Sequence, residues 1–157
     1  TAPNELRRKK GFSEELGVFV TILKDGELRG SMGYPQGQYP LIDGVFKAAK
    51  DAAFRDPRFK RLRKAELAKV KFQVDVLGKF VKLRRLDDFV VGKHGLFVKF
   101  GPFQGIELPR DAKKFGWAKQ EVLEKTLRKA GLAPEMRKDK QIEVYKFTTR
   151  TFSEQLK

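Results

Sequence analysis

The chain has 157 residues, of which 40% are hydrophobic, and a net charge of +15 from 35 Lys and Arg against 20 Asp and Glu. This size supports one domain with a hydrophobic core, or two small lobes that share one. The absence of cysteine excludes disulfides, thiolate catalysis and Cys-ligated zinc. The single histidine argues against a multi-histidine metal site, and we expect no cofactor.

Charge and hydropathy also limit the partners of the chain. No apolar run approaches the roughly 20 residues that span a bilayer, so we expect no membrane association. Basic residues 7–10 interrupt what would be the apolar part of a signal peptide, and a cytoplasmic protein is the expectation. The positive charge favours RNA, DNA or a nucleoprotein complex, although it also fits a merely solvated surface.

The first half of the chain predicts a hairpin followed by a helix. Residues 1–12 are polar and basic and predict an N-terminal extension with a frayed start. Residues 17–23 predict a strand, and Asp25-Gly26 predicts a tight turn into a second strand. Residues 40–54 predict a helix that ends before Pro57. Its expected inner stripe comprises Leu41, Ile42, Val45, Phe46, Ala49, Ala52 and Ala53.

The second half predicts more antiparallel strands and one long helix. Residues 64–70 predict a helical turn, and residues 85–91 a short helix. Residues 95–100 and 103–108 predict a hairpin around Gly101-Pro102. The remaining expected elements are an alternating strand at 70–76 with Asp75 facing outward, a helix at 118–132 capped by Gly131, and a final strand at 141–152.

Together these elements predict the fold class. Because tight hairpins join antiparallel neighbours, we expect an α+β fold, with a mainly antiparallel sheet packed with helices.

Several stretches of the chain resemble one known family in their order. They read "GVFVTILKDGELRGSMGYP", "AAFRDPRF", "VGKHGL", "LPRDAKKFGW" with "KAGL", and "IEVYKF". Over about residues 17–154 they resemble the AMMECR domain family. The resemblance implies one AMMECR-like domain over residues 1–157, with two intertwined lobes, one larger and one smaller, around a cleft. It implies no settled reaction, and it suggests Memo-type or radical-SAM proteins as partners.

The family hallmark is usually LRGCIG, and residues 28–33 read LRGSMG here. Ser31 replaces the cysteine and Met32 replaces the isoleucine. Because the cysteine is absent, this chain cannot use a thiol at the hallmark segment. Arg110 stands where the family usually has glutamine, and Lys114 where an acidic residue is common. This copy is therefore more basic than the family pattern.

Ser31 raises the question of nucleophilic catalysis. His94 lies between glycines in an expected exposed loop, and it can serve as a base with Asp56 as the group that orients it. Nothing in the sequence shows that these side chains meet. We favour the alternative that Ser31 is a small packed residue where the family prefers cysteine.

The hallmark segment predicts an anion-binding site formed by Arg29, Gly30 and Gly33. An arginine beside accessible backbone N–H groups suits a carboxylate or phosphate. The alternative is that a carboxylate of the fold holds Arg29, with Asp56 as the candidate partner. Arg55, Asp56 and Arg58 are further candidate ligand contacts. Their structural alternative, which we favour, is an Asp-Pro turn.

A basic run predicts a surface that follows a phosphate backbone. Its residues are Lys60, Arg61, Arg63, Lys64, Lys69 and Lys71. Phe59 and Phe72 are expected to be buried, so base stacking has little support. Our first hypothesis is a basic binding or adaptor module for nucleic acid or a nucleoprotein complex. The second is an enzyme acting on an anionic substrate around LRGSMG, and the third is a scaffold within a protein complex.

Overall fold

The structure is a computed structural model that describes residues 2–154. Contacts divide the chain into two compact units. The first unit runs to Leu77 and resumes at Arg150, and the second spans Gly78–Thr149. Each unit combines helices with a sheet of antiparallel pairs, so the α+β fold class is confirmed. The expectation of one domain with two intertwined lobes around a cleft stays a prediction.

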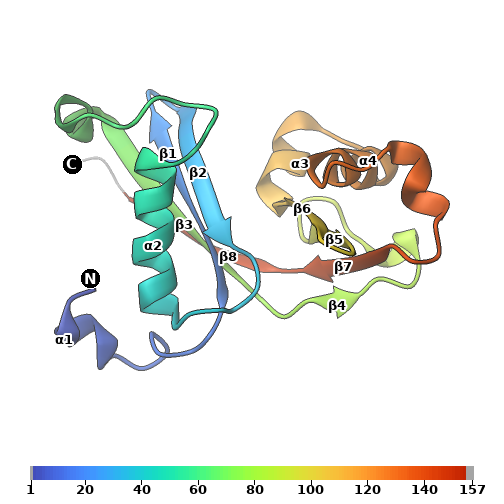
Figure 1. The fold of residues 1–157 in the computed structure, drawn as a ribbon, viewed down its shortest axis with the longest axis horizontal. Helices are drawn as coiled ribbons and strands as arrows, with labels where there is room; N and C mark the ends of the chain where they lie inside the picture. The colour runs from blue at the N-terminus through green and yellow to red at the C-terminus, as the bar shows by residue number, and fades with distance from the viewer. Residues whose placement is uncertain (1, 155–157) are drawn as a thin grey trace. The chain divides into compact units, whose positions relative to one another are not determined.

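The first unit is a four-stranded sheet with one long helix on its face (Figure 1). The strand order is β2-β1-β3-β8. The predicted hairpin of β1 and β2 is confirmed, and both Asp25 and Gly26 have positive φ, as a type I′ turn requires. The elements are α1 (Asn4–Arg7), β1 (Gly17–Lys24), β2 (Glu27–Tyr34), α2 (Leu41–Phe54), the 3-10 helix η1 (Lys64–Lys69), β3 (Val70–Leu77) and β8 (Thr149–Ser153).

Helix α2 packs on the sheet through a stripe of small residues. Ala48, Ala52 and Ala53 are buried with Ile42, and Ile22 of β1 packs against this helix. The predicted stripe is right at Ile42, Ala52 and Ala53. It missed Ala48, and its members Leu41, Val45, Phe46 and Ala49 are only half-buried, because a helix that lies close to a sheet buries small side chains at the contact.

Asp75 of β3 corrects one prediction. It was expected to face outward, but it is 1% exposed, and the Thr151 hydroxyl of β8 lies 2.6 Å from its Oδ1. An alternating sequence predicts a strand with one solvated face. The neighbouring strand β8 brings a hydroxyl partner to that face, so a carboxylate can be buried there.

The N-terminal segment is held more firmly than predicted. Ala2 is buried, and Arg7 forms an ion pair with Asp43 of α2. The backbone N–H of Ile42 donates to the Phe12 carbonyl. The expected basic extension with a frayed start is therefore packed against the first unit.

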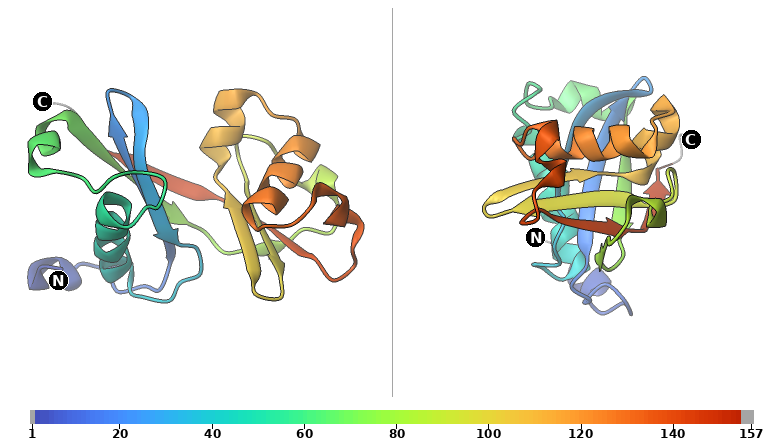
Figure 2. Two further views of the ribbon diagram at one scale, coloured as in Figure 1. Left: turned by 45° about the horizontal axis from the view of Figure 1, so that its top comes forward. Right: turned by 90° about the vertical axis from the view of Figure 1, so that its right-hand side faces the viewer.

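The second unit is a sheet of order β4-β7-β5-β6 with helices on one face (Figure 2). Buried Val98 of β5 packs against Leu127 of α4, and buried Leu96 packs against Val122. The elements are β4 (Val81–Lys82), the 3-10 helix η2 (Leu86–Asp88), β5 (Gly95–Phe100), β6 (Phe103–Glu107), α3 (Pro109–Phe115), α4 (Lys119–Lys129), the 3-10 helix η3 (Pro134–Lys138) and β7 (Glu143–Phe147).

Sequence patterning predicted most of these elements. The β5–β6 hairpin and helix α4 are confirmed, whereas α3 was not anticipated. Gly131 caps α4 as expected, with φ of 81°. Its N–H donates to the Arg128 carbonyl and that of Leu132 to the Leu127 carbonyl, which is a Schellman motif.

The predicted single strand at 141–152 is wrong in one respect. The segment forms two strands, β7 and β8, which belong to different sheets. The division falls at Thr148, which lies between them. Along the described part of the chain, no helix has the length and apolar character needed to cross a membrane.

Candidate functional site

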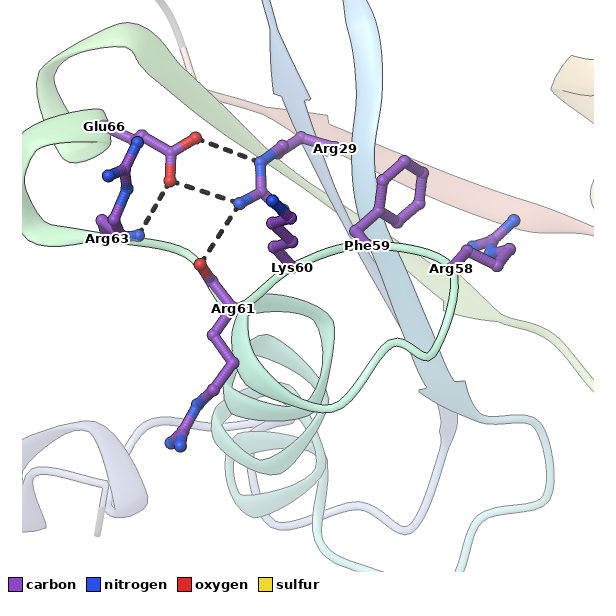
Figure 3. A pocket seen from close by; sticks show the side chains of 7 residues that line it. All are labelled: Arg29, Arg58, Phe59, Lys60, Arg61, Arg63 and Glu66. Atoms are coloured by element: carbon purple, nitrogen blue, oxygen red, sulfur yellow. Dashed lines mark hydrogen bonds and ion pairs between the residues drawn. The ribbon is translucent and has the colours of Figure 1, made fainter.

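The first unit carries a basic pocket of about 490 Å³ beside β2 (Figure 3). Its wall is formed by one residue of β2, the loop that follows α2, and the start of η1. The loop turns at Asp56-Pro57 and then runs without regular structure to η1, which exposes its long side chains. The lining residues are Arg29, Arg58, Phe59, Lys60, Arg61, Arg63 and Glu66.

Glu66 holds Arg29 in place within this pocket. Its Oε1 and Oε2 accept from Nε and Nη2 of Arg29 at 3.1 and 3.2 Å (Figure 3). The same carboxylate accepts from Lys24 Nζ at 3.1 Å and from the Arg63 backbone N–H at 2.8 Å. The alternative that a carboxylate of the fold holds Arg29 is thus observed, but the carboxylate is Glu66 and not Asp56.

These donors determine the charge state of Glu66. The hydrogen bonds from Arg29, with those from Arg63 and Lys24, lower its pKa to about 2. Glu66 is therefore ionised at neutral pH, and its oxygens are already occupied by donors. A carboxylate in this state is a structural counter-ion and a poor general base.

Asp56 and Arg58 close the free edge of β2. Asp56 Oδ2 accepts from the Ser31 backbone N–H at 3.0 Å, and Arg58 Nη2 lies 3.5 Å from the Ser31 carbonyl oxygen. Arg58 also donates to both oxygens of Asp56, at 3.0 and 2.8 Å. Burial alone would raise the pKa of Asp56, but the bonds from Arg58 and Ser31 outweigh it and lower the pKa to about 2.

Three cations of the pocket have no carboxylate partner. Within residues 2–154, Lys60, Arg61 and Arg63 form no ion pair, whereas Arg29 and Arg58 do. The Arg61 guanidinium lies 5.5 Å from the ring centroid of Phe54. The pocket therefore presents positive charge that the fold leaves uncompensated.

Two aromatic residues lie near the pocket, and one of them, Phe59, differs from expectation. Phe59, expected to be buried, is half-buried and lines the pocket, with the Arg58 guanidinium 5.3 Å from its ring centroid. Phe54, at the end of α2, is 46% exposed.

The hallmark glycines serve packing. A Cβ on Gly30 would overlap the Ala52 carbonyl oxygen of α2. A Cβ on Gly33 would overlap the ring of Phe19 and the carbonyl oxygen of Val18. Only a residue without a side chain allows these close approaches. Neither glycine lines the pocket, so Arg29 is the one pocket residue among the three predicted to form the anion-binding site.

Ser31 and His94 each have partners within their own units. The Ser31 hydroxyl lies 3.0 Å from Oγ1 of Thr21 on β1. His94 is buried, which corrects the expected exposed loop, and its Nδ1 accepts from the Val90 N–H at 3.0 Å. Burial and the nearby lysines lower the pKa of His94. The catalytic pairing of Ser31 with His94 stays a prediction that these contacts do not support.

The other predicted contacts lie outside the pocket lining. The Arg55 side chain is 79% exposed and pairs with Asp51 on α2. Lys64 and Lys69 are exposed on η1, and Lys71 is half-buried on β3. In the described ranges, no group of three or more His, Asp or Glu side chains is placed to hold a metal ion.

Sequence reasoning missed the part played by Glu66. Arg29 and Glu66 are 37 residues apart, and no local pattern links them. One signal was available: residues 55–71 contain eight basic residues and only two acidic ones, Asp56 and Glu66. Isolated carboxylates in a basic run are candidates for internal counter-ions, and both prove to be so here.

Comparison with known proteins gives a consistent family assignment. The sequence model of the family described as AMMECR1 matches residues 1–152. A protein of Nanoarchaeum equitans is 40% identical, over 97% of this chain and 87% of that protein. One of Aquifex aeolicus is 36% identical, over 97% and 80% respectively. The crystal structure of an uncharacterized protein from Pyrococcus horikoshii aligns with a TM-score of 0.92 at 33% identity, covering 99% of this chain and 80% of that one.

Proposed function

The chain belongs to the AMMECR1 family, and from its pocket we propose that it is a binding module for the phosphate backbone of nucleic acid. The observation that carries this proposal is the set of three cations without a carboxylate partner, Lys60, Arg61 and Arg63. They lie within four residues of one another along a loop, with the Arg61 side chain directed away from those of Lys60 and Arg63 (Figure 3), so we expect them to contact different phosphates of the backbone.

The other pocket residues keep these cations in place. Glu66 binds Arg29, and Arg29 Nη2 lies 3.4 Å from the Arg61 carbonyl oxygen. The Asp56–Arg58 pair fixes the start of the same loop to β2. An ordered loop loses less conformational entropy on binding than a flexible one, which favours affinity.

The pocket chemistry favours binding over catalysis. Its lining has no hydroxyl, imidazole or thiol, and its one carboxylate is occupied by donors. A nucleophile or general base requires a group that is free to take a proton. Arginine and lysine, by contrast, are the residues that bind phosphate oxygens.

Salt dependence of polynucleotide binding tests the proposal. We compare the wild-type protein with Arg61→Gln/Arg63→Gln by fluorescence anisotropy on a labelled oligonucleotide. The matched control is Lys64→Gln/Lys69→Gln, which removes the same charge outside the pocket. Each lost phosphate contact lowers the slope of log affinity against log salt by about 0.7–0.9.

We expect the pocket variant to lose at least tenfold in affinity and about 1.5 in slope, because two contacts disappear. The control is expected to stay close to the wild type. Equal effects of the two variants would assign binding to overall charge and not to the pocket. No binding even at low salt would overturn the proposal.

A further inference from the structure

A second aromatic and basic feature lies in the other unit, at the end of α3. Phe115 and Trp117 stack with ring centroids 5.3 Å apart and an interplanar angle of 22°. Between them, Gly116 has a left-handed backbone with φ of 65°, which ends the helix. A residue that readily adopts this conformation lets the chain turn between the two rings.

The two rings differ in how they are held. Trp117 is half-buried and packs against the core cluster that includes Phe89, Ala112 and Val122. Phe115 rests on Trp117 but is 60% exposed, the largest fraction among the exposed large hydrophobic side chains of the described chain. A ring that is supported by Trp117 and still mostly exposed is an ordered flat apolar surface.

Lysines flank this surface. Lys125 Nζ lies 4.5 Å from the Trp117 ring centroid, and Lys114 Nζ lies 5.5 Å from that of Phe115. Neither lysine forms an ion pair with a carboxylate in residues 2–154. The surface therefore combines a flat face with lysines that form no direct ion pair, the two properties of sites that bind single-stranded nucleic acid.

We infer that the stacked pair Phe115–Trp117 binds an unpaired base of single-stranded nucleic acid, while Lys114 and Lys125 bind the adjacent phosphates. The base stacks on Phe115, in the place now held by the Lys114 ammonium group. A cation over an exposed ring is held weakly, so Lys114 can leave the ring for a phosphate. The absence of a directed donor or acceptor on the rings makes this site tolerant of any base.

The chain offers a direct reporter for this site. It contains one tryptophan, so its intrinsic indole fluorescence comes from Trp117. Three polyanions are titrated at equal phosphate concentration: oligouridylate, an abasic oligomer of the same length, and inorganic polyphosphate. Oligoglutamate at equal charge concentration is the acidic peptide control. We expect oligouridylate to quench Trp117 and the two ligands without bases to leave the emission nearly unchanged.

Phe115→Leu tests the ring itself. Because the side chain is mostly exposed, the variant is expected to fold, which its melting curve checks. Base stacking on one aromatic ring accounts for about a fivefold or larger change in affinity, so Phe115→Leu should weaken oligouridylate by that factor and leave polyphosphate unchanged. Equal quenching by the abasic oligomer, or by an acidic peptide such as oligoglutamate, would overturn the inference, as would unchanged affinity of the variant.

The inference does not rest on the pocket of the first unit, and the experiment separates the two. Arg61→Gln/Arg63→Gln removes pocket charge and should retain quenching of Trp117 at saturating oligouridylate. If the pocket proposal fails, base-dependent quenching still supports this site. If quenching fails while the pocket variant loses affinity, only the site at Phe115 is overturned.

Discussion

At Ser31, the backbone groups that face away from β1 are bonded by the neighbouring Asp56–Arg58 pair. An edge strand with free N–H and C=O groups can pair with other chains, and proteins protect such edges. Here one ion pair supplies both an acceptor and a donor to the edge of β2. The short sequence RDPR therefore supplies hydrogen bonds to the edge of the hallmark strand β2 at Ser31, in place of a neighbouring strand.

The ionised carboxylates of Asp56 and Glu66 predict that the protein loses stability at low pH. Both have a pKa near 2 in the folded protein, below their ordinary values of 3.8 and 4.5. In this window the unfolded chain binds more protons, so both groups stabilise the protein above about pH 4.5. That stabilisation is lost as the pH falls towards 2.

The measurement is the free energy of unfolding by urea between pH 6 and pH 2. The wild-type protein should lose stability most steeply from pH 4.5 downwards, and Asp56→Asn/Glu66→Gln should have a flatter profile over that range. The double variant will also be less stable at pH 6, so the slope is the diagnostic quantity. Parallel profiles for the two proteins would contradict this account.

At the scale of elements, the turn residues Asp25-Gly26 and Gly131 correctly predicted where a hairpin turns and where a helix ends. Asp25-Gly26 and Gly131 have positive φ, and their sequence signals act over a few residues. The segment at 141–152 shows the limit of local pattern, because its residues continue one strand-like sequence across Thr148. Its division into β7 and β8 depends on which sheet each half joins, and that is decided by distant strands.

The cap of α4 is a clean test of backbone conformation. Apart from its chain neighbours, no heavy atom lies closer than 4.0 Å to a Cβ built on Gly131, so a substitution meets strain from its φ of 81° alone. Gly131→Ala should lower the free energy of unfolding by about 1–2 kcal/mol. Gly131→Asn should cost less, because asparagine tolerates this conformation. Equal losses, measured by urea unfolding, would argue against a conformational cause.

At the scale of the molecule, the sequence predicted the basic character of the site but not its arrangement. The run from Lys60 to Lys71 was visible as charge, and the pocket uses its first three members, Lys60, Arg61 and Arg63. The sequence could not show that Arg29 joins them, because Glu66 brings Arg29 there through a contact across 37 residues. Long-range pairs of this kind leave no periodic trace.

The two units should differ in autonomy. The second unit is one continuous segment with its own core, whereas the first needs β8 from beyond it. We expect a fragment of residues 78–149 to unfold cooperatively when followed by circular dichroism. A fragment of residues 2–77 should be less stable or aggregate, because Asp75 loses its Thr151 partner and β3 gains an open edge.

A rescue variant controls for chain length. The Gly78 N–H donates to the Thr148 carbonyl at 2.8 Å. The places where the chain leaves the first unit and returns to it therefore lie side by side. Replacing residues 78–149 by a short Gly-Ser linker should therefore return β8 to its sheet and restore cooperative unfolding. A fragment of residues 2–77 as stable as this linked protein would contradict the role given to β8.

The place of β8 in the chain has a consequence for biosynthesis. A ribosome must translate the whole second unit after β3 before it reaches the strand that completes the first sheet. At about 5–20 residues per second, this delay is on the order of several seconds. During that time the nascent sheet presents β3 as an unpaired edge beside other emerging chains. The first unit, although translated first, is therefore the one whose sheet is completed last.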